Sequence, residues 1–119
     1  MNTHCVIDEL LQKDKIVFQS GRQIWVIEIE KITFIEACNY YALIHADGKT
    51  IVVRETLDEI EARLAHHSFL RVHRSIILNL NIFQCMERKD NGLVVRTTIG
   101  RDFKVSRYRV KAIRNKILR

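Results

Sequence analysis

Apolar and polar residues alternate in short runs along most of the chain, and β-branched and aromatic side chains dominate these runs. Alternation of this kind, bounded by turn residues, is typical of antiparallel strands with one face in a core. Ser20-Gly21, Asp47-Gly48 and Asp90-Asn91-Gly92 separate successive runs and predict hairpins. A further turn is expected at Gly100-Arg101. The predicted strands cover residues 15–19, 22–27, 32–37, 41–46, 50–54, 82–88, 93–99 and 103–105.

Two segments show the helical period instead. The first begins with a capping box of Thr56 and Glu59, and its buried face is expected to hold Leu57, Ile60 and Leu64. Its other face is interpreted as solvated and consists of Glu55, Asp58, Glu59, Glu61 and Arg63. The second is expected from about Arg107, with one face made of Val110, Ile113 and Ile117.

The pattern therefore predicts a mainly β domain of short antiparallel strands, with one internal helix and one C-terminal helix. This domain is expected at residues 15–119. Residues 1–14 are expected to form a lead-in segment, with a helical turn at residues 7–11.

Composition narrows the class of protein. A chain of 119 residues with 47% hydrophobic and 29% charged residues fits one soluble domain. It has no apolar run long enough to cross a bilayer and no secretory signal. Its three cysteines are odd in number and lack CxxC spacing, so we expect a reducing, cytoplasmic location. Cys38 and Cys85 are expected to be small buried residues.

The charge is unevenly distributed along the chain. Residues 1–60 carry 6 Lys and Arg against 10 Asp and Glu, whereas residues 61–119 carry 14 against 4, and 10 of those 14 are Arg. A basic excess concentrated in one half favours a polyanionic partner. The Arg bias favours recognition, because the planar guanidinium fork fits phosphate oxygens and the guanine edge.

The basic half contains a polar segment, Arg71-Val72-His73-Arg74-Ser75, between two apolar stretches. With its flanks anchored in a core, this segment would face a partner; the alternative is a strand end that is basic by chance. Arg74 and Arg107 are candidates for bidentate guanine contacts. The candidates for phosphate contacts are Arg71, Arg109, Lys111 and Arg114.

Strand alternation adds a second interpretation of Arg71. It would place Arg71, His73 and Ser75 on one face and leave Val72 and Arg74 on the other. Arg71 is therefore equally well interpreted as a structural residue, paired with Glu36 or Glu55. His73 is likewise either a DNA donor or a satisfied structural histidine, and a role as a pH-responsive group lacks a partner.

Four stretches occur in a distinctive order along the chain. They are Ile35-Glu36-Ala37 with Tyr41 and Ile44-His45, Arg54-Glu55-Thr56-Leu57 with Glu59 and Leu64, Phe69 to Ser75 with Asn79, and Val105-Ser106-Arg107. Together they resemble the LytTR-type DNA-binding domains of bacterial transcriptional regulators. The resemblance implies a compact β fold of three small antiparallel sheets, which enters successive major grooves of double-stranded DNA with loops.

The resemblance also implies contact residues and partners. The family's contacting positions correspond to Asn39-Tyr40-Tyr41, His73-Arg74-Ser75 and Arg107-Tyr108-Arg109. The last loop departs from the family, which often has two successive Arg before Tyr. Members commonly read direct-repeat promoter sites with two copies, as effector domains of two-component response regulators. No receiver domain precedes Lys15, so an excised fragment or a stand-alone form is expected.

Several alternatives stay open at this point. One of the adjacent Tyr40 and Tyr41 is expected to pack inward. His66-His67 has no further ligand at metal spacing, so neither a metal nor a cofactor is expected. No glycine-rich phosphate loop, activated nucleophile or carboxylate pair indicates an enzyme. The rival functions are RNA or single-strand binding and protein interaction, but basic residues at strand and helix ends favour loop contacts with a duplex.

Overall fold

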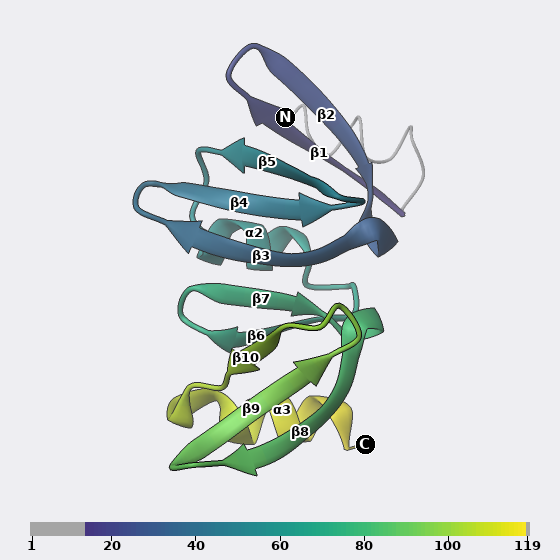
Figure 1. Cartoon of the computed structure of the whole chain (residues 1–119). Coiled ribbons are helices and arrows are strands. Elements are labelled where there is room, and N and C mark those ends of the chain that lie inside the picture. Colours follow the sequence, from purple (N-terminus) through teal and green to yellow (C-terminus); the bar gives the residue numbers. More distant parts are fainter. Residues whose placement is uncertain (1–13, 119) are drawn as a thin grey trace.

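The computed structural model describes residues 14–118, so the helical turn expected at residues 7–11 lies outside the described residues. The strands are β1 (Lys15–Ser20), β2 (Gln23–Glu28), β3 (Ile32–Cys38), β4 (Tyr41–Ala46), β5 (Lys49–Val53), β6 (Phe69–His73), β7 (Ile76–Asn79), β8 (Phe83–Lys89), β9 (Gly92–Thr97) and β10 (Asp102–Lys104). The α-helices are α2 (Leu57–Arg63) and α3 (Val110–Ile117) (Figure 1). Short 3₁₀ helices are η1 (Ile29–Lys31), η2 (Leu80–Ile82) and η3 (Arg107–Arg109).

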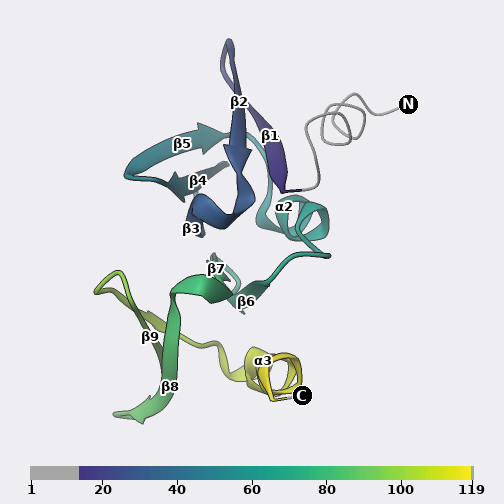
Figure 2. The same cartoon turned by 90° about the vertical axis from the view of Figure 1, so that its right-hand side faces the viewer.

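The strands form three antiparallel sheets. β1 and β2 make a two-stranded sheet, β5-β4-β3-β7-β6 a five-stranded sheet, and β10-β9-β8 a three-stranded sheet. In Figure 2 the five-stranded sheet lies between the β1–β2 hairpin above and β8 and β9 below, and both α-helices lie on the right-hand side. The predicted fold class, with its internal and C-terminal helices, is confirmed.

The hairpin turns lie close to their predicted positions. Asp47-Gly48 joins β4 to β5, and both residues have positive φ (51° and 75°), a backbone that Asp-Gly adopts readily in tight hairpins. Asp90-Asn91 joins β8 to β9. The first turn is Gly21-Arg22 rather than Ser20-Gly21, because Ser20 still pairs with Gln23.

The polar segment from Arg71 to Ser75 is a strand end followed by a turn. β6 ends at His73 and β7 starts at Ile76, with a β-bulge between Arg71 and His73. The predicted alternation holds as far as His73, since Val72 is buried in the second core and Arg71 faces the other side. It ends there, because Arg74 is exposed in the turn and shares no strand face with Val72. The reversal of the chain presents Arg74 at the tip of a hairpin.

The middle of the five-stranded sheet is buried on both faces. Ile35 and Ile77 face one hydrophobic core, which α2 and the β1–β2 hairpin complete. Their neighbours Phe34 and Leu78 face a second core, which β9, β10 and α3 complete. Because successive side chains of a strand point to opposite faces, β3 and β7 contribute to both cores. The five-stranded sheet therefore lies between the two cores and contributes side chains to both.

Both helices bury the predicted faces. The residues buried along α2 and at its end are Leu57, Ile60 and Leu64. The capping box of Thr56 and Glu59 also forms. The residues that α3 packs into the second core are Val110, Ile113 and Ile117. The α-helix begins at Val110 rather than at about Arg107, and η3 precedes it without a side-chain cap at the start of either.

The cysteines differ from the expectation that both are buried. Cys38 is exposed and Cys85 is half-buried. Cys38 is the last residue of β3 and pairs with the exposed Tyr41, so no core packs over this end of the strand. None of the helices in residues 14–118 has the length and apolar character needed to cross a membrane.

Ile77→Ala and Leu78→Ala test whether β7 contributes to both cores. These side chains are 1% and 0% exposed, one in each core. We expect each substitution to lower the free energy of unfolding by about 2–5 kcal/mol, because each loses transfer energy and leaves a cavity. Urea denaturation followed by circular dichroism measures this. The exposed Val52 is the control, and Val52→Ala should change stability by less than about 1 kcal/mol. Losses that small at both core positions would contradict the assignment.

Candidate nucleic-acid interface

Three loops lie along one edge of the molecule. They are the β3–β4 turn, the β6–β7 turn and η3, all on the left-hand side of Figure 1. Backbone hydrogen bonds join them: Ala37 N–H donates to Ser75 C=O at 2.9 Å, and Ser106 N–H donates to Val72 C=O at 2.8 Å. The three predicted contact segments are therefore on one side, in the order of the chain.

The β3–β4 turn carries Asn39 and Tyr40, and Tyr41 begins β4. Asn39 has a φ of 56°, in the left-handed region that Asn tolerates better than most residues. The expectation that one tyrosine packs inward is wrong, since Tyr40 is 87% and Tyr41 43% exposed. Tyr41 alternates with the buried Ala42 and so points away from the first core. The guanidinium of Arg54 lies 5.9 Å from its ring centroid.

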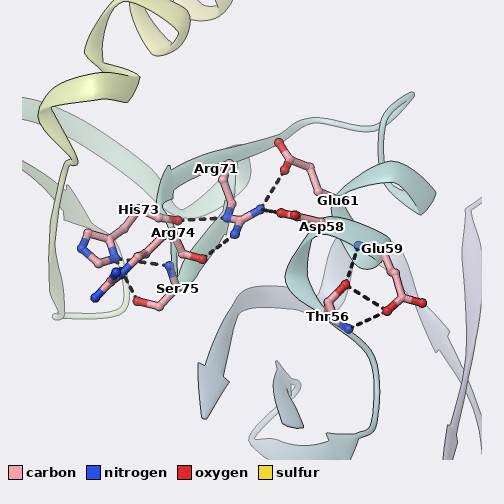
Figure 3. Close-up of polar contacts among 8 residues, drawn as sticks. All are labelled: Thr56, Asp58, Glu59, Glu61, Arg71, His73, Arg74 and Ser75. Carbon is pink, nitrogen blue, oxygen red and sulfur yellow. Dashed lines mark hydrogen bonds and ion pairs between the residues drawn. The ribbon is translucent and has the colours of Figure 1, made fainter. Parts of the chain in front are cut away.

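The β6–β7 turn places two donors at its tip. His73 Nδ1 lies 3.2 Å from the Ser75 backbone N and 2.8 Å from Ser75 Oγ. A backbone N–H only donates, so Nδ1 is the acceptor and the neutral ring carries its proton on Nε2. Arg74 is exposed, and its side chain makes no hydrogen bond or ion pair with the described residues. His73 and Arg74 point away from α2 (Figure 3).

The third loop is η3 with the start of α3. Arg107 is exposed and Tyr108 is 91% exposed, while Arg109 is half-buried. Lys111 and Arg114 are exposed on α3, on the side away from the buried Ile113. None of these four basic side chains has an ion-pair partner within residues 14–118, so their charge is not neutralised by neighbouring carboxylates.

A hollow of about 320 Å³ separates the first two loops. Asn39 and Tyr40 line it from the β3–β4 turn, Arg74 lines it from the β6–β7 turn, and Asp58 lines it from α2. The two turns are thus neighbours across an open depression. No group of three His, Cys, Asp or Glu side chains in the described part of the chain is arranged to hold a metal ion.

Arg71 lies between the β6–β7 turn and α2. Its side chain is 7% exposed and its Nη1 lies 2.9 Å from Asp58 Oδ1 and 2.8 Å from Glu61 Oε1. These contacts support the structural interpretation of Arg71, but with other partners than predicted. Glu36 instead binds His45 and Arg101, and Glu55 binds Arg63. The interpretation of the α2 face as merely solvated is corrected, because two of its carboxylates hold Arg71.

Sequence reasoning missed Arg54 as a member of this edge. The sequence predicts Arg54 only as the last residue of a strand and as part of the stretch that leads into the helix, yet the register of β4 and β5 pairs Val53 with Ala42. That pairing brings the next residue, Arg54, beside Tyr41 and next to the β3–β4 turn. The Asp-Gly hairpin could have revealed this, since a tight turn fixes the register of the two strands that it joins.

Comparisons with known proteins all indicate the same family. The family model described as the LytTr DNA-binding domain matches residues 22–118. The chain is 29% identical over 100 residues to the sensory transduction protein LytR of Staphylococcus haemolyticus, covering 83% of this chain and 39% of that protein. It is 30% identical over 74 residues to the sensory transduction protein LytT of Bacillus cereus, covering 62% of this chain and 30% of that protein. It thus spans less than half the length of these relatives.

A solved LytTr DNA-binding domain from Bacillus cereus has the same fold. The TM-score is 0.74 at 22% sequence identity, and the match covers 87% of this chain and 96% of that one.

Glu59→Gln tests the cap that starts α2. Hydrogen bonds from the Thr56 backbone N–H and hydroxyl hold the pKa of Glu59 below its ordinary value of 4.5. A lowered folded pKa stabilises the protein above the unfolded pKa, and this contribution is lost as pH falls through the folded pKa. We expect the stability difference between wild type and Glu59→Gln to shrink on acidification from pH 7. Urea titrations at several pH values measure it, with Glu30→Gln as the control; a difference that grows on acidification would contradict it.

The tautomer of His73 can be tested separately. We expect neutral His73 to carry its proton on Nε2, because Ser75 N–H occupies Nδ1. Long-range ¹H–¹⁵N correlation NMR distinguishes the two ring nitrogens. The exposed His66 supplies the reference for a ring without such a bond among the described residues. A protonated Nδ1 in the neutral ring of His73 would contradict the assignment.

Proposed function

The chain belongs to the family of LytTr DNA-binding domains, and we propose that it reads specific sequences in double-stranded DNA with the three loops of one edge. The observation that carries this proposal is their arrangement. Backbone hydrogen bonds join the β3–β4 turn, the β6–β7 turn and η3, and each offers exposed donors. A partner with regularly spaced acceptors and phosphates along its length matches such an edge.

The proposal assigns the loops to successive major grooves. The major groove is about 12 Å wide and admits a two-stranded ribbon, and one side of a duplex presents it again about 34 Å further on. The longest dimension of the molecule is 44 Å. The molecule is thus longer than the spacing between two consecutive major grooves, which supports this assignment.

Each loop has a separate role in this proposal. Arg74 and Arg107 make bidentate contacts to guanine O6 and N7, and His73 offers its Nε2–H beside Arg74. Asn39, Tyr40 and Tyr41 contact the neighbouring groove. Phosphate contacts set the register without reading sequence, and the residues proposed for them are Arg54, Ser75, Tyr108, Arg109, Lys111 and Arg114. Arg71 is left out, because its guanidinium is occupied inside the protein.

The biological setting is part of the same proposal. The relatives LytR and LytT are sensory transduction proteins, and the chain matches only 39% and 30% of their lengths. We propose that this domain is the DNA-binding part of a bacterial transcriptional regulator, with a receiver domain as the source of its signal. Two copies on direct-repeat promoter sites would double the number of grooves that are read.

Selection of bound duplexes from a random pool tests the proposed function. We expect one enriched motif with guanines in two clusters. A specific reader should keep its preference among sequences as salt rises, because only the phosphate contribution is screened. Equal binding to all sequences at every salt concentration would favour a sequence-indifferent nucleic-acid binder, and no binding would favour a protein-interaction domain.

Arg74→Ala and Arg107→Ala test the assigned guanine contacts. Each should reduce discrimination between the selected and a random duplex by about 1–3 kcal/mol. The melting temperature should stay nearly unchanged, because both side chains are exposed. Fluorescence anisotropy on the two duplexes measures this.

Arg22→Ala is the matched control, since Arg22 is an exposed arginine in the distant β1–β2 turn. It should leave the discrimination unchanged. Equal losses on the selected and random duplexes for Arg74→Ala and Arg107→Ala would show that these residues contact only phosphates.

A further inference from the structure

Arg71 connects the β6–β7 turn to α2 through four hydrogen bonds (Figure 3). Its Nε donates to His73 C=O at 2.9 Å and its Nη2 donates to Arg74 C=O. Its Nη1 donates to Asp58 and Glu61 at 2.9 and 2.8 Å. Four of the five N–H donors of the guanidinium are therefore occupied. We call this group of Arg71, Asp58, Glu61 and the two carbonyls the Arg71 clamp.

The clamp holds the main chain of the residues proposed to read DNA. Its two carbonyl acceptors belong to His73 and Arg74, one at the end of β6 and one in the turn itself. Fixing both carbonyls with one planar group restricts the rotation of the peptide between them. The direction in which the His73 and Arg74 side chains leave the backbone is thereby restricted as well.

The clamp is anchored on a rigid support. Asp58 and Glu61 lie on one side of α2, and α2 is fixed by its capping box and by the buried Leu57 and Ile60. The two carboxylates are themselves 87% and 48% exposed, whereas the Arg71 side chain is 7% exposed. The acids therefore contribute little buried surface to the fold, and their evident task is to hold the guanidinium.

We propose that Arg71 is a positioning residue for DNA reading, and that Asp58 and Glu61 of α2 set the orientation of the β6–β7 turn through it. The inference rests on the proposed function, because it assigns His73 and Arg74 to the duplex. Binding sites require their contacting groups to be held within about 0.5 Å of the productive geometry. In this proposal two acidic residues contribute to specific DNA binding, although their own negative charge opposes the approach of a polyanion.

Asp58→Ala combined with Glu61→Ala removes both acceptors of Arg71 Nη1. It separates positioning from plain electrostatics, because the two effects have opposite signs. The double variant loses two negative charges, so electrostatics alone would tighten binding to every duplex. Positioning predicts that the preference for the selected over a random duplex falls by about tenfold, the discrimination supplied by one bidentate arginine contact. The melting temperature is expected to fall, because the nearly buried Arg71 guanidinium loses both ionic partners. Binding is therefore measured at a temperature at which circular dichroism shows the variant folded.

Asp47→Asn combined with Glu30→Gln is the matched control. It makes the same change of charge on the opposite edge of the molecule, at the β4–β5 turn and η1 (Figure 1). Asn tolerates the positive φ of Asp47, so the turn is kept. The control should tighten binding slightly to both duplexes. An identical response of both double variants would overturn the proposal.

Arg71→Lys separates positioning from a phosphate contact. A lysine keeps the charge and would serve as a phosphate contact, so binding and its salt dependence would be retained. Lysine cannot reproduce the planar guanidinium fork. If Arg71 positions the turn, Arg71→Lys should lose the preference for the selected duplex, while the slope of log K against log salt should stay unchanged. Retained preference would overturn the proposal. If Arg71→Lys fails to fold, the double variant at 58 and 61 decides alone.

Amide hydrogen exchange tests the clamp without DNA. In the double variant the Ser75 and Ala37 amides should exchange faster, since their bonds to His73 Nδ1 and Ser75 C=O depend on the turn. The Glu59 amide, bound to Thr56 Oγ1 at 3.1 Å, should stay protected and report that α2 is intact. Unchanged exchange at Ser75 would refute the clamp. If the wild-type protein shows no preference among duplexes, the proposed function is refuted. The hydrogen-exchange rates would still test the Arg71 clamp in that case.

Discussion

The structure depends on one constraint: the central strands of the five-stranded sheet must bury both of their faces. Ile35 and Ile77 enter one core and Phe34 and Leu78 enter the other, so each core is built partly from the same backbone. The residues at which both faces are buried are all apolar, and the exposed polar residues of this edge lie beyond them, in the loops. The contact loops therefore lie at an edge as a direct result of how the cores are made.

A second set of contacts joins the five-stranded sheet to the three-stranded sheet. Arg101, in the turn before β10, lies over the rings of Phe34 and Phe103 at 4.8 and 4.7 Å and approaches Glu36 at 3.5 Å. Glu36 also accepts a hydrogen bond from His45 on β4. Arg101, from the basic second half of the chain, thus joins the two sheets. The basic excess of the second half is therefore shared between structural ion pairs and the unpaired cations of the loop edge.

The sequence predicts the local features of this fold well. The capping box of Thr56 and Glu59, the Asp47-Gly48 turn and the apolar face of α3 are all short-range patterns, and all are confirmed. The partners of Arg71 were not predictable in this way. They lie 13 and 10 residues earlier on a helix, and no short-range pattern shows which residues of α2 face β6.

The candidate site shows the same division between local and long-range information. Resemblance placed its three segments along the chain, but the exposure of both tyrosines depends on what packs over the end of β4. The contact between Arg54 and Tyr41 likewise follows from the pairing of β4 with β5. Sequence patterns identify which side chains are suited to DNA, whereas the fold decides which of them are free to reach it.

On the β6–β7 turn, the Arg71 clamp binds peptide carbonyls rather than side chains. Every residue type supplies the same carbonyl, so exchanging the side chains at positions 73 and 74 leaves the anchor of the turn in place. Under the proposed function, substitutions at these two positions would change the groups offered to DNA while the contacts of Arg71 with the main chain stay in place. The edge proposed to read DNA thus separates the main-chain anchor of the turn from the side chains at its tip.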